Sequence, residues 1–403
     1  AFSSDYSTGY GYWIANFGQD STFSGNTTAG GNQDDNGIGD FKYAPPAGYL
    51  ALCTSNLPTP SIVDGSEYFN TVLYTGNAST NAITGVGFDL STDGGLVWIK
   101  NRPSAYYHGL YDSVRGTGIT KSLSSNRTEQ EGFLSTNHNL VSFDSDGFTL
   151  GSTSNTNTLN TSGQSHVAWN WKAGGTAVSN TDGSITSQVS ANVDAGFSIA
   201  TYTEPSGSFS FGHGLGVQPD MFIFKRRDSI ENWIVWHKDF GAPTNNGLYL
   251  NSTNAQFSSG SNWLTAIDSD TISITSGQVS GAGTKVCYSF ANTEGYLKAG
   301  SYTGNGSSDG PFVYTGFRPA FWLMKSISDA THWVIYDSAR ETFNAVQDQL
   351  LPNETNAEAA SGRPVDFLSN GVKLRFSSYL NDSGQTYIYL AFAETPQKFA
   401  NAR

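Results

Sequence analysis

Short apolar runs that end in a lysine recur three times along the chain. They are Leu96–Lys100, Met221–Lys225 and Phe321–Lys325. An aromatic residue stands eleven positions after each lysine, and these residues are Tyr111, Trp236 and Tyr336. An uninterrupted apolar run of this length predicts a strand that is buried on both faces and central in its sheet. Because the spacing is kept three times, we predict three related units.

Alternating apolar and polar residues close each unit. The apolar positions of these closing runs are Val167, Trp169 and Trp171, then Val286, Tyr288 and Phe290, then Ile388, Leu390 and Phe392. A period of two predicts strands. We therefore predict an all-β fold of tandem β-sandwich repeats, jelly-roll or lectin-like, each of about 100 residues. Helical spacing occurs only over 341–351, through Phe343, Val346 and Leu350.

The repeat register divides the chain into five parts. Residues 1–62 precede the repeats and end in a proline-stiffened linker, and repeat one covers 63–173. An insertion, 174–194, is expected to be a linker or a β-arm. Repeat two covers 195–293, and repeat three with the tail covers 294–403. The direct junction between repeats two and three predicts a rigid contact there and a looser joint between repeats one and two.

Composition and charge exclude several classes of function. The net charge is −13, which argues against binding to nucleic acid and to anionic membrane surfaces. No apolar run is long enough for a membrane-spanning helix. Cys53 and Cys287 lie in different units, so two buried free thiols are expected in preference to a disulfide.

A repeated polar pair is the strongest candidate for chemistry. Asp112 with Arg115, and Asp337 with Arg340, follow the aromatic residue of repeats one and three. Arginine next to aspartate suits a ligand clamp, but it equally suits an ion pair that fixes a turn. Repeat two has His237 in place of the aspartate and lacks the arginine. A turn tolerates such an exchange better than a binding site does, so we favour the structural interpretation.

Other reactive residues give no active-site pattern. The lysines that end the apolar runs are expected to lay their stems on the core and to keep the amine in water. The six histidines lack ligand spacing, and the aspartate-glycine clusters at 34–37 and 144–147 suit turns better than calcium. A carboxylate pair for glycoside hydrolysis is recognised only by its separation in space. We predict no catalytic residue, no metal and no cofactor.

Several stretches resemble a known group of proteins. Tyr43–Pro58 resembles the end of a SPRY-like or concanavalin-like lectin domain. Val167–Gly175, Gly214–Asp220 and Asp309–Phe321 resemble tandem β-repeats that follow such a domain in virion proteins of marine tailed phages, including cyanophages. The resemblance implies a tail-fibre or other structural virion protein and supplies no catalytic residues. Repeat one departs from it at 85–95, where the other repeats have a proline, which changes one loop.

These observations predict a non-enzymatic structural or adhesive component of a phage virion: a tail fibre, spike or capsid fibre. The alternatives are a polysaccharide depolymerase and a secreted carbohydrate-binding protein. Exposed aromatics in polar loops are the candidates for ligand binding, namely Tyr106, Tyr107, Trp263 and Tyr379.

The expected location is virion or extracellular. The expected partners are further copies of the chain, other virion proteins and, where a ligand is bound, cell-surface glycans. A homotrimer or a higher symmetric assembly is expected, since phage fibres are commonly trimers and few lysines protect the sheet edges. Residues 1–62 are expected to form the attachment end.

Overall fold

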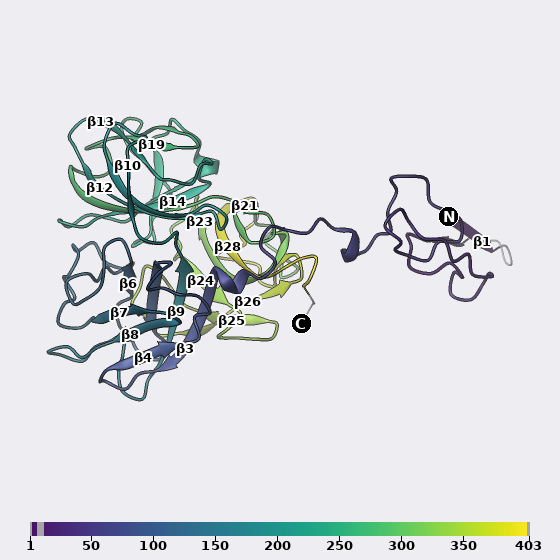
Figure 1. Ribbon diagram of the computed structural model, residues 1–403, viewed down its shortest axis with the longest axis horizontal. Coiled ribbons are helices and arrows are strands. Elements are labelled where there is room, and N and C mark those ends of the chain that lie inside the picture. Colours follow the sequence, from purple (N-terminus) through teal and green to yellow (C-terminus); the bar gives the residue numbers. More distant parts are fainter. Residues whose placement is uncertain (1, 6–11, 401–403) are drawn as a thin grey trace. The chain divides into compact units, whose positions relative to one another are not determined.

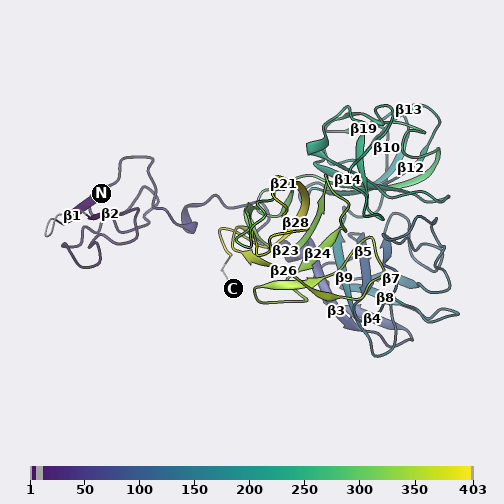
Figure 2. The same ribbon diagram turned by 180° about the vertical axis from the view of Figure 1, so that it is seen from behind.

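The computed structural model describes residues 2–5 and 12–400, and the chain forms two compact units (Figures 1 and 2). The first unit comprises the residues up to Pro60 together with Gln397–Phe399, and the second comprises Ser61–Pro396. The second unit contains all three repeats. The insertion between repeats one and two also belongs to it.

The first unit is held by polar contacts more than by a core. It contains the antiparallel strands β1 (Phe2–Asp5) and β2 (Tyr12–Ala15). Phe23 and Ala51 are its only buried apolar residues among those described. The Asp34 carboxylate accepts hydrogen bonds from the amides of Ile38 and Ala51, at 2.9 and 2.7 Å, so this cluster closes a turn. The aromatic run Tyr10–Phe17 predicts a strand in this unit, and Tyr10 and Gly11 of that run lie outside the described residues.

Each repeat is a sandwich of two antiparallel sheets, as predicted. In repeat one the inner sheet has the order β3 (Phe69–Thr75), β9 (Ser165–Lys172), β5 (Gly95–Asn101), β6 (Gly109–Asp112). Its outer sheet has the order β4 (Asn81–Thr84), β8 (Gly147–Leu150), β7 (Leu140–Asp144).

Repeat two has the same plan with additions at both edges of its inner sheet. The shared inner strands are β12 (Phe197–Glu204), β20 (Gly283–Phe290), β14 (Met221–Arg226), β15 (Ile234–His237). The outer strands are β13 (Ser208–Gly212), β19 (Thr271–Thr275), β18 (Leu264–Ile267). The added strands are β10 (Val178–Asn180), β11 (Ser187–Asn192), β16 (Asn246–Tyr249), β17 (Phe257–Ser258). The insertion therefore supplies a β-arm, β10 and β11, that extends the sheet of repeat two.

Repeat three completes the set. Its inner sheet has the order β21 (Leu297–Thr303), β28 (Thr386–Pro396), β23 (Phe317–Ser326), β24 (Val334–Asp337). Its outer sheet has the order β22 (Phe312–Tyr314), β27 (Gly371–Leu374), β26 (Ala359–Leu368), β25 (Val346–Gln349). The helical spacing over 341–351 does not produce a helix. Val346 lies on strand β25, Leu350 forms a β-bridge with Ile335, and both side chains are buried in the sandwich.

Strand pairing confirms the predicted register of the repeats. The central residue of each apolar run pairs with the middle apolar residue of each closing run: Trp98 with Trp169, Ile223 with Tyr288, Leu323 with Leu390. The aromatic residue that follows each lysine lies on the neighbouring strand, where Tyr111 pairs with Val97. Trp236 and Tyr336 occupy the same position in their repeats.

The central strands are buried on both faces, and in repeats one and two each of them separates two cores. In β5, Leu96 and Trp98 belong to a core that residues of all three repeats build together, whereas Val97 and Ile99 pack inside the sandwich of repeat one. This shared core makes 61–396 one body. The predicted looser joint between repeats one and two was therefore wrong, because side chains join these two repeats as they join the others.

Candidate functional site

The repeated aspartate-arginine pair lies between repeats, and in repeat three it forms the first seam, with repeat one. Asp337 accepts a hydrogen bond from Arg340 Nε at 2.6 Å and another from the indole of Trp169 at 3.0 Å. Arg340 also pairs with Glu358 at 2.7 Å, and Glu358 pairs with Arg102 at 2.6 Å. Trp169 and Arg102 belong to repeat one, so the network fixes one repeat to another.

The second seam joins repeats one and two with the same arrangement. Asp112 binds Arg115 and accepts a hydrogen bond from the Tyr288 hydroxyl at 2.7 Å. Arg115 pairs with Glu131 at 3.1 Å, and Glu131 pairs with Arg227 at 2.8 Å. Tyr288 and Arg227 come from repeat two. The ion-pair interpretation is confirmed, and the pair fixes an interface as well as a turn.

The third seam, between repeats two and three, replaces this network. The residues at the five equivalent positions are His237, Phe240, Gln256, Ile327 and Leu390. One main-chain hydrogen bond survives at all three seams. It runs from Gln256 N to Ile327 O here, at 2.9 Å, and equally from Glu131 N to Arg227 O and from Glu358 N to Arg102 O.

Burial decides the charge state at these seams. Burial lowers the pKa of the Arg115 guanidinium, but its interactions with Asp112, Tyr288 and Glu131 together outweigh burial, so the pKa is raised. Arg340 beside Asp337 behaves in the same way. His237 has no such partner for its Nε2, and burial lowers its pKa to about 4, so this imidazole is neutral at pH 7.

A further set of hydrogen bonds closes the repeats into a ring. The indole of Trp233 in repeat two donates to Ser124 O in repeat one at 2.8 Å, and Trp333 in repeat three donates to Tyr249 O in repeat two at 2.9 Å. His108 Nε2 in repeat one lies 3.1 Å from Leu351 O in repeat three. Each repeat thus contacts the next in one direction until the ring closes, as in a cyclic oligomer.

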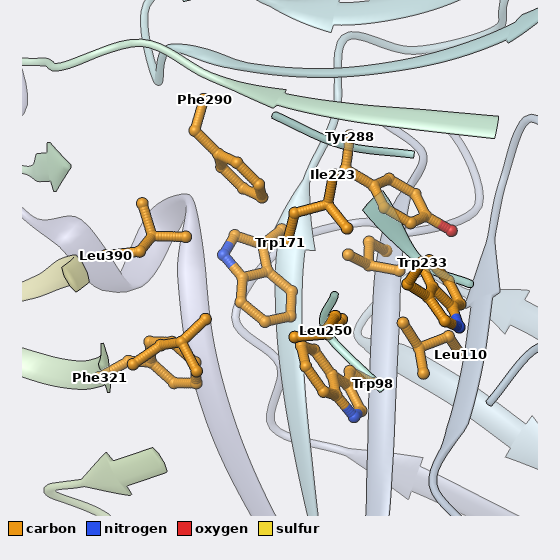
Figure 3. A pocket seen from close by; sticks show the side chains of 12 residues that line it. Trp98, Leu110, Trp171, Ile223, Trp233, Leu250, Tyr288, Phe290, Phe321 and Leu390 are labelled. Atoms are coloured by element: carbon orange, nitrogen blue, oxygen red, sulfur yellow. The ribbon is translucent and has the colours of Figure 1, made fainter. Parts of the chain in front are cut away.

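The shared core encloses a small cavity where the three repeats meet (Figure 3). Its volume is about 20 Å³, and Trp98, Trp171, Ile223 and Phe321 are among the residues that line it. A water molecule needs polar partners, and this lining is apolar. The cavity is a packing feature and has no polar group to orient a ligand.

The lysines that end the apolar runs are buried, so the expectation of an amine in water was wrong. Lys100, Lys225 and Lys325 have no exposed area. Lys100 Nζ donates to the carbonyls of Asn101 and Ser104 at 2.6 and 3.0 Å, which ties down the loop after the strand. Burial lowers the pKa of Lys100 and Lys225 to about 7 and that of Lys325 to about 8.

Trp263 is not an exposed platform, which corrects its selection as a ligand-binding candidate. Its side chain is fully buried in the sandwich of repeat two, with its ring 6.1 Å from that of Phe222. The indole nitrogen donates to Asn246 O at 2.9 Å. The polar residues around it in the sequence belong to loops, but the indole itself fills the core.

The other three candidates are half-buried and belong to different repeats. Tyr106 and Tyr107 lie in one loop of repeat one, where the Arg127 guanidinium stands 4.6 Å from the Tyr107 ring centroid. Tyr379, in repeat three, accepts a hydrogen bond from the amide of His332 at 2.6 Å and has Arg363 at 4.1 Å from its ring centroid. A cation already lies against each of these two rings. The structure does not assemble the four candidates into one site.

Sequence reasoning missed two kinds of residue. Glu131 and Glu358 have no sequence signal, since each acts through an arginine of another repeat. Phe312 and Tyr314 are exposed at 44% and 58% and lie on β22, where their alternation with Val313 was a visible signal.

Among the described residues no group of histidine, cysteine or acidic side chains is placed to hold a metal. Asp146 instead accepts hydrogen bonds from the amides of Gly85 and Gly87, at 3.0 and 2.8 Å, which fixes a loop. Cys53 is exposed, contrary to expectation, while Cys287 is buried, and both are free thiols. Within 2–5 and 12–400, no helix has the length and apolar character needed to cross a membrane.

Comparison with known proteins gives one result. No curated protein matches the chain. A family model described as "Domain of unknown function (DUF7483)" matches residues 64–396, which contain every strand of the three repeats. One family model that spans all three repeats agrees with the shared core and the closed ring, in which the three repeats fold as one unit. The chain therefore belongs to the DUF7483 family.

Proposed function

We propose that this chain is a non-enzymatic structural and adhesive component of a phage virion, as part of a tail fibre, spike or capsid fibre. The observation that carries the proposal is the use of the repeated charged residues. Asp112, Arg115, Asp337 and Arg340 are buried and tie repeats together. These ion pairs therefore stabilise a rigid body with three related outer faces.

A rigid three-repeat body suits adhesion. Related loops and outer sheets appear three times, and several copies of the chain would multiply them further. Repetition converts weak single contacts into strong overall attachment when the contacts engage together. The virion assignment rests on the resemblance of Val167–Gly175 and Asp309–Phe321 to virion repeats. Further copies of the chain, other virion proteins and cell-surface glycans are the proposed partners.

Two measurements on the natural source test this function. Mass spectrometry of purified particles should detect the chain, and immunogold labelling should place it on a fibre, spike or capsid surface. The purified chain should release no reducing ends from host envelope polysaccharides. Release that persists through purification would favour the depolymerase alternative, and absence from particles would favour a secreted carbohydrate-binding protein.

A further inference from the structure

The outer sheet of repeat three carries a pair of exposed aromatic rings. Phe312 and Tyr314 lie two positions apart on the edge strand β22, and Val313 between them is buried. Alternate residues of a strand project from the same face. Both rings therefore lie on the solvent face of the sandwich, whose other face packs into the core through Val313.

The other repeats build the same strand with no aromatic residue at these two solvent-facing positions. Strand pairing sets Phe312 opposite Lys373 and Tyr314 opposite Gly371. The residues at the two matching positions are Ala82 and Thr84 in repeat one, and Ser210 and Gly212 in repeat two. The sandwich folds with these small residues, so its stability does not require the aromatic pair.

Balanced charges flank the two rings. Lys373, directly across from Phe312, pairs with Asp309 at 2.7 Å, and the Asp309 side chain is 83% exposed. Asp366, the next residue across the sheet, pairs with Arg375 at 2.6 Å. The face thus combines aromatic surface with hydrogen-bond donors and acceptors and adds little net charge.

We propose that this face, defined as Phe312 and Tyr314 with Lys373 and Asp366, binds a neutral, extended polysaccharide. The inference rests on the proposed adhesive function and names its ligand class. Residues two apart on a strand are separated by about 6.6 Å, so the two rings can stack on neighbouring sugars of one glycan chain. The paired lysine and aspartate then face sugar hydroxyls, which both donate and accept hydrogen bonds.

The size of the apolar patch favours a glycan over a protein. A stable protein complex buries about 800 Å² on each partner, whereas two partly exposed rings bordered by ion pairs offer much less apolar surface. A sugar ring needs only one aromatic face and a few hydrogen bonds. A second copy of the chain is therefore the less favoured occupant.

Repeat one is the suitable place for a gain-of-function test, because the β-arm covers the matching position in repeat two. Ser184 N donates to Ser210 Oγ at 2.9 Å, and Ser187 Oγ donates to Gly212 O at 2.7 Å. In repeat one, Ala82 and Thr84 are exposed. Aromatic residues introduced there will meet solvent.

The test is calorimetric titration of the full chain with cellohexaose, laminarihexaose and xylohexaose. We expect the natural chain to bind at least one of them at one site. F312A/Y314T, which installs the residues of repeat one, should lower that affinity at least about tenfold through the lost stacking. A82F/T84Y should raise the number of sites from one to two. Phe343→Ala removes an exposed ring elsewhere and should change nothing.

Three outcomes would overturn the proposal, and they differ in what else they affect. Unchanged affinity in F312A/Y314T would show that the glycan binds elsewhere and would leave the adhesive function standing. Binding of none of the three probes would reject the ligand class, while detection of the chain in particles would still support a structural role. A lower sedimentation mass for F312A/Y314T than for the natural chain would assign the face to contact between copies.

Discussion

The buried arginines stabilise the fold because each forms an ion pair with an aspartate of its own turn. Removing one member of a buried pair leaves an uncompensated charge, which costs about 3–5 kcal/mol. Arg340→Met leaves the buried Asp337 without its cation and leaves Glu358 paired with Arg102 alone at the first seam. We expect the free energy of unfolding, measured with urea, to fall by that amount.

Lys172→Met is the matched control for this measurement. Lys172 pairs with Asp93 at 2.9 Å, and the two side chains are 27% and 37% exposed. Solvent screens such a pair, so its loss should cost at most about 1 kcal/mol. Equal losses in the two variants would mean that the first seam contributes no more than a surface ion pair.

His237 should make stability fall in mild acid. Its folded pKa of about 4 lies below the ordinary value of 6.5 because the ring is buried, and Asp239, Lys238 and Asp220 are the charges around it. The unfolded chain therefore binds more protons between pH 6.5 and 4. Above pH 6.5 the imidazole is neutral in both states and the stability is fully present. As the pH falls from 6.5 through 4, the free energy of unfolding decreases by up to about 3 kcal/mol.

The contribution of His237 is separated from that of the carboxylates by comparison with His237→Gln. Urea unfolding of both proteins at pH 7, 6, 5 and 4 should give a difference in stability that shrinks as the pH falls. A constant difference across this range would mean that the imidazole does not titrate between the two states.

At the scale of the strand, residues of one element belong to two cores, so a single truncation affects contacts between repeats. Trp171 is the last residue but one of β9, and its ring centroid lies 5.7 Å from those of both Phe321 and Phe392 of repeat three. Trp171→Ala should lower the free energy of unfolding by about 3–5 kcal/mol. Val178→Ala, at an exposed position of the β-arm, should stay within about 0.5 kcal/mol. A small loss at Trp171 would mean that the shared core repacks around the gap.

Because the third seam packs without charged residues at these five positions, we expect that the five residues of the first-seam network can be replaced together by those of the third seam. We expect the combined variant R102I/W169L/D337H/R340F/E358Q, which installs the residues of the third seam, to be more stable than Arg340→Met alone. Replacing all partners by apolar or neutral groups leaves no unpaired charge, whereas the single change does. Urea unfolding compares the two variants, and a less stable combined variant would show that the seams differ in backbone geometry.

At the scale of the whole molecule, the shared core predicts cooperative unfolding. Isolated repeat one, 63–173, would expose Leu96, Trp98, Trp169 and Trp171, which are now covered by the other repeats. We expect calorimetry of 61–403 to show one transition and isolated 63–173 to lack a folded, monomeric state. Separate transitions for the repeats would indicate that the seams contribute little.

The homotrimer remains a prediction at this scale. Light scattering of the purified chain should give about three times the chain mass of 43.2 kDa if the expected assembly forms. A monomer mass at micromolar concentration would contradict it. In that case, the ring of three repeats within one chain would be the whole of the cyclic arrangement.

Local patterns in the sequence were enough for the fold class and the register. Alternation and uninterrupted apolar runs report how many faces of a strand are buried, and three copies of the spacing located Trp98, Ile223 and Leu323 at one structural position. The aspartate-arginine pair was also predictable, because both partners lie three residues apart in one turn.

Only the tertiary structure decided which core each apolar face enters and what the polar residues do there. Glu358 meets Arg102 across 256 positions of the chain, and no local pattern records such a contact. The lysine amines were predicted to lie in water because the carbonyl groups that accept their hydrogen bonds come into position only when the following loop folds over them. Trp263 and 341–351 were misread for the same physical reason: burial against a distant sheet overrides the polarity and spacing of sequence neighbours.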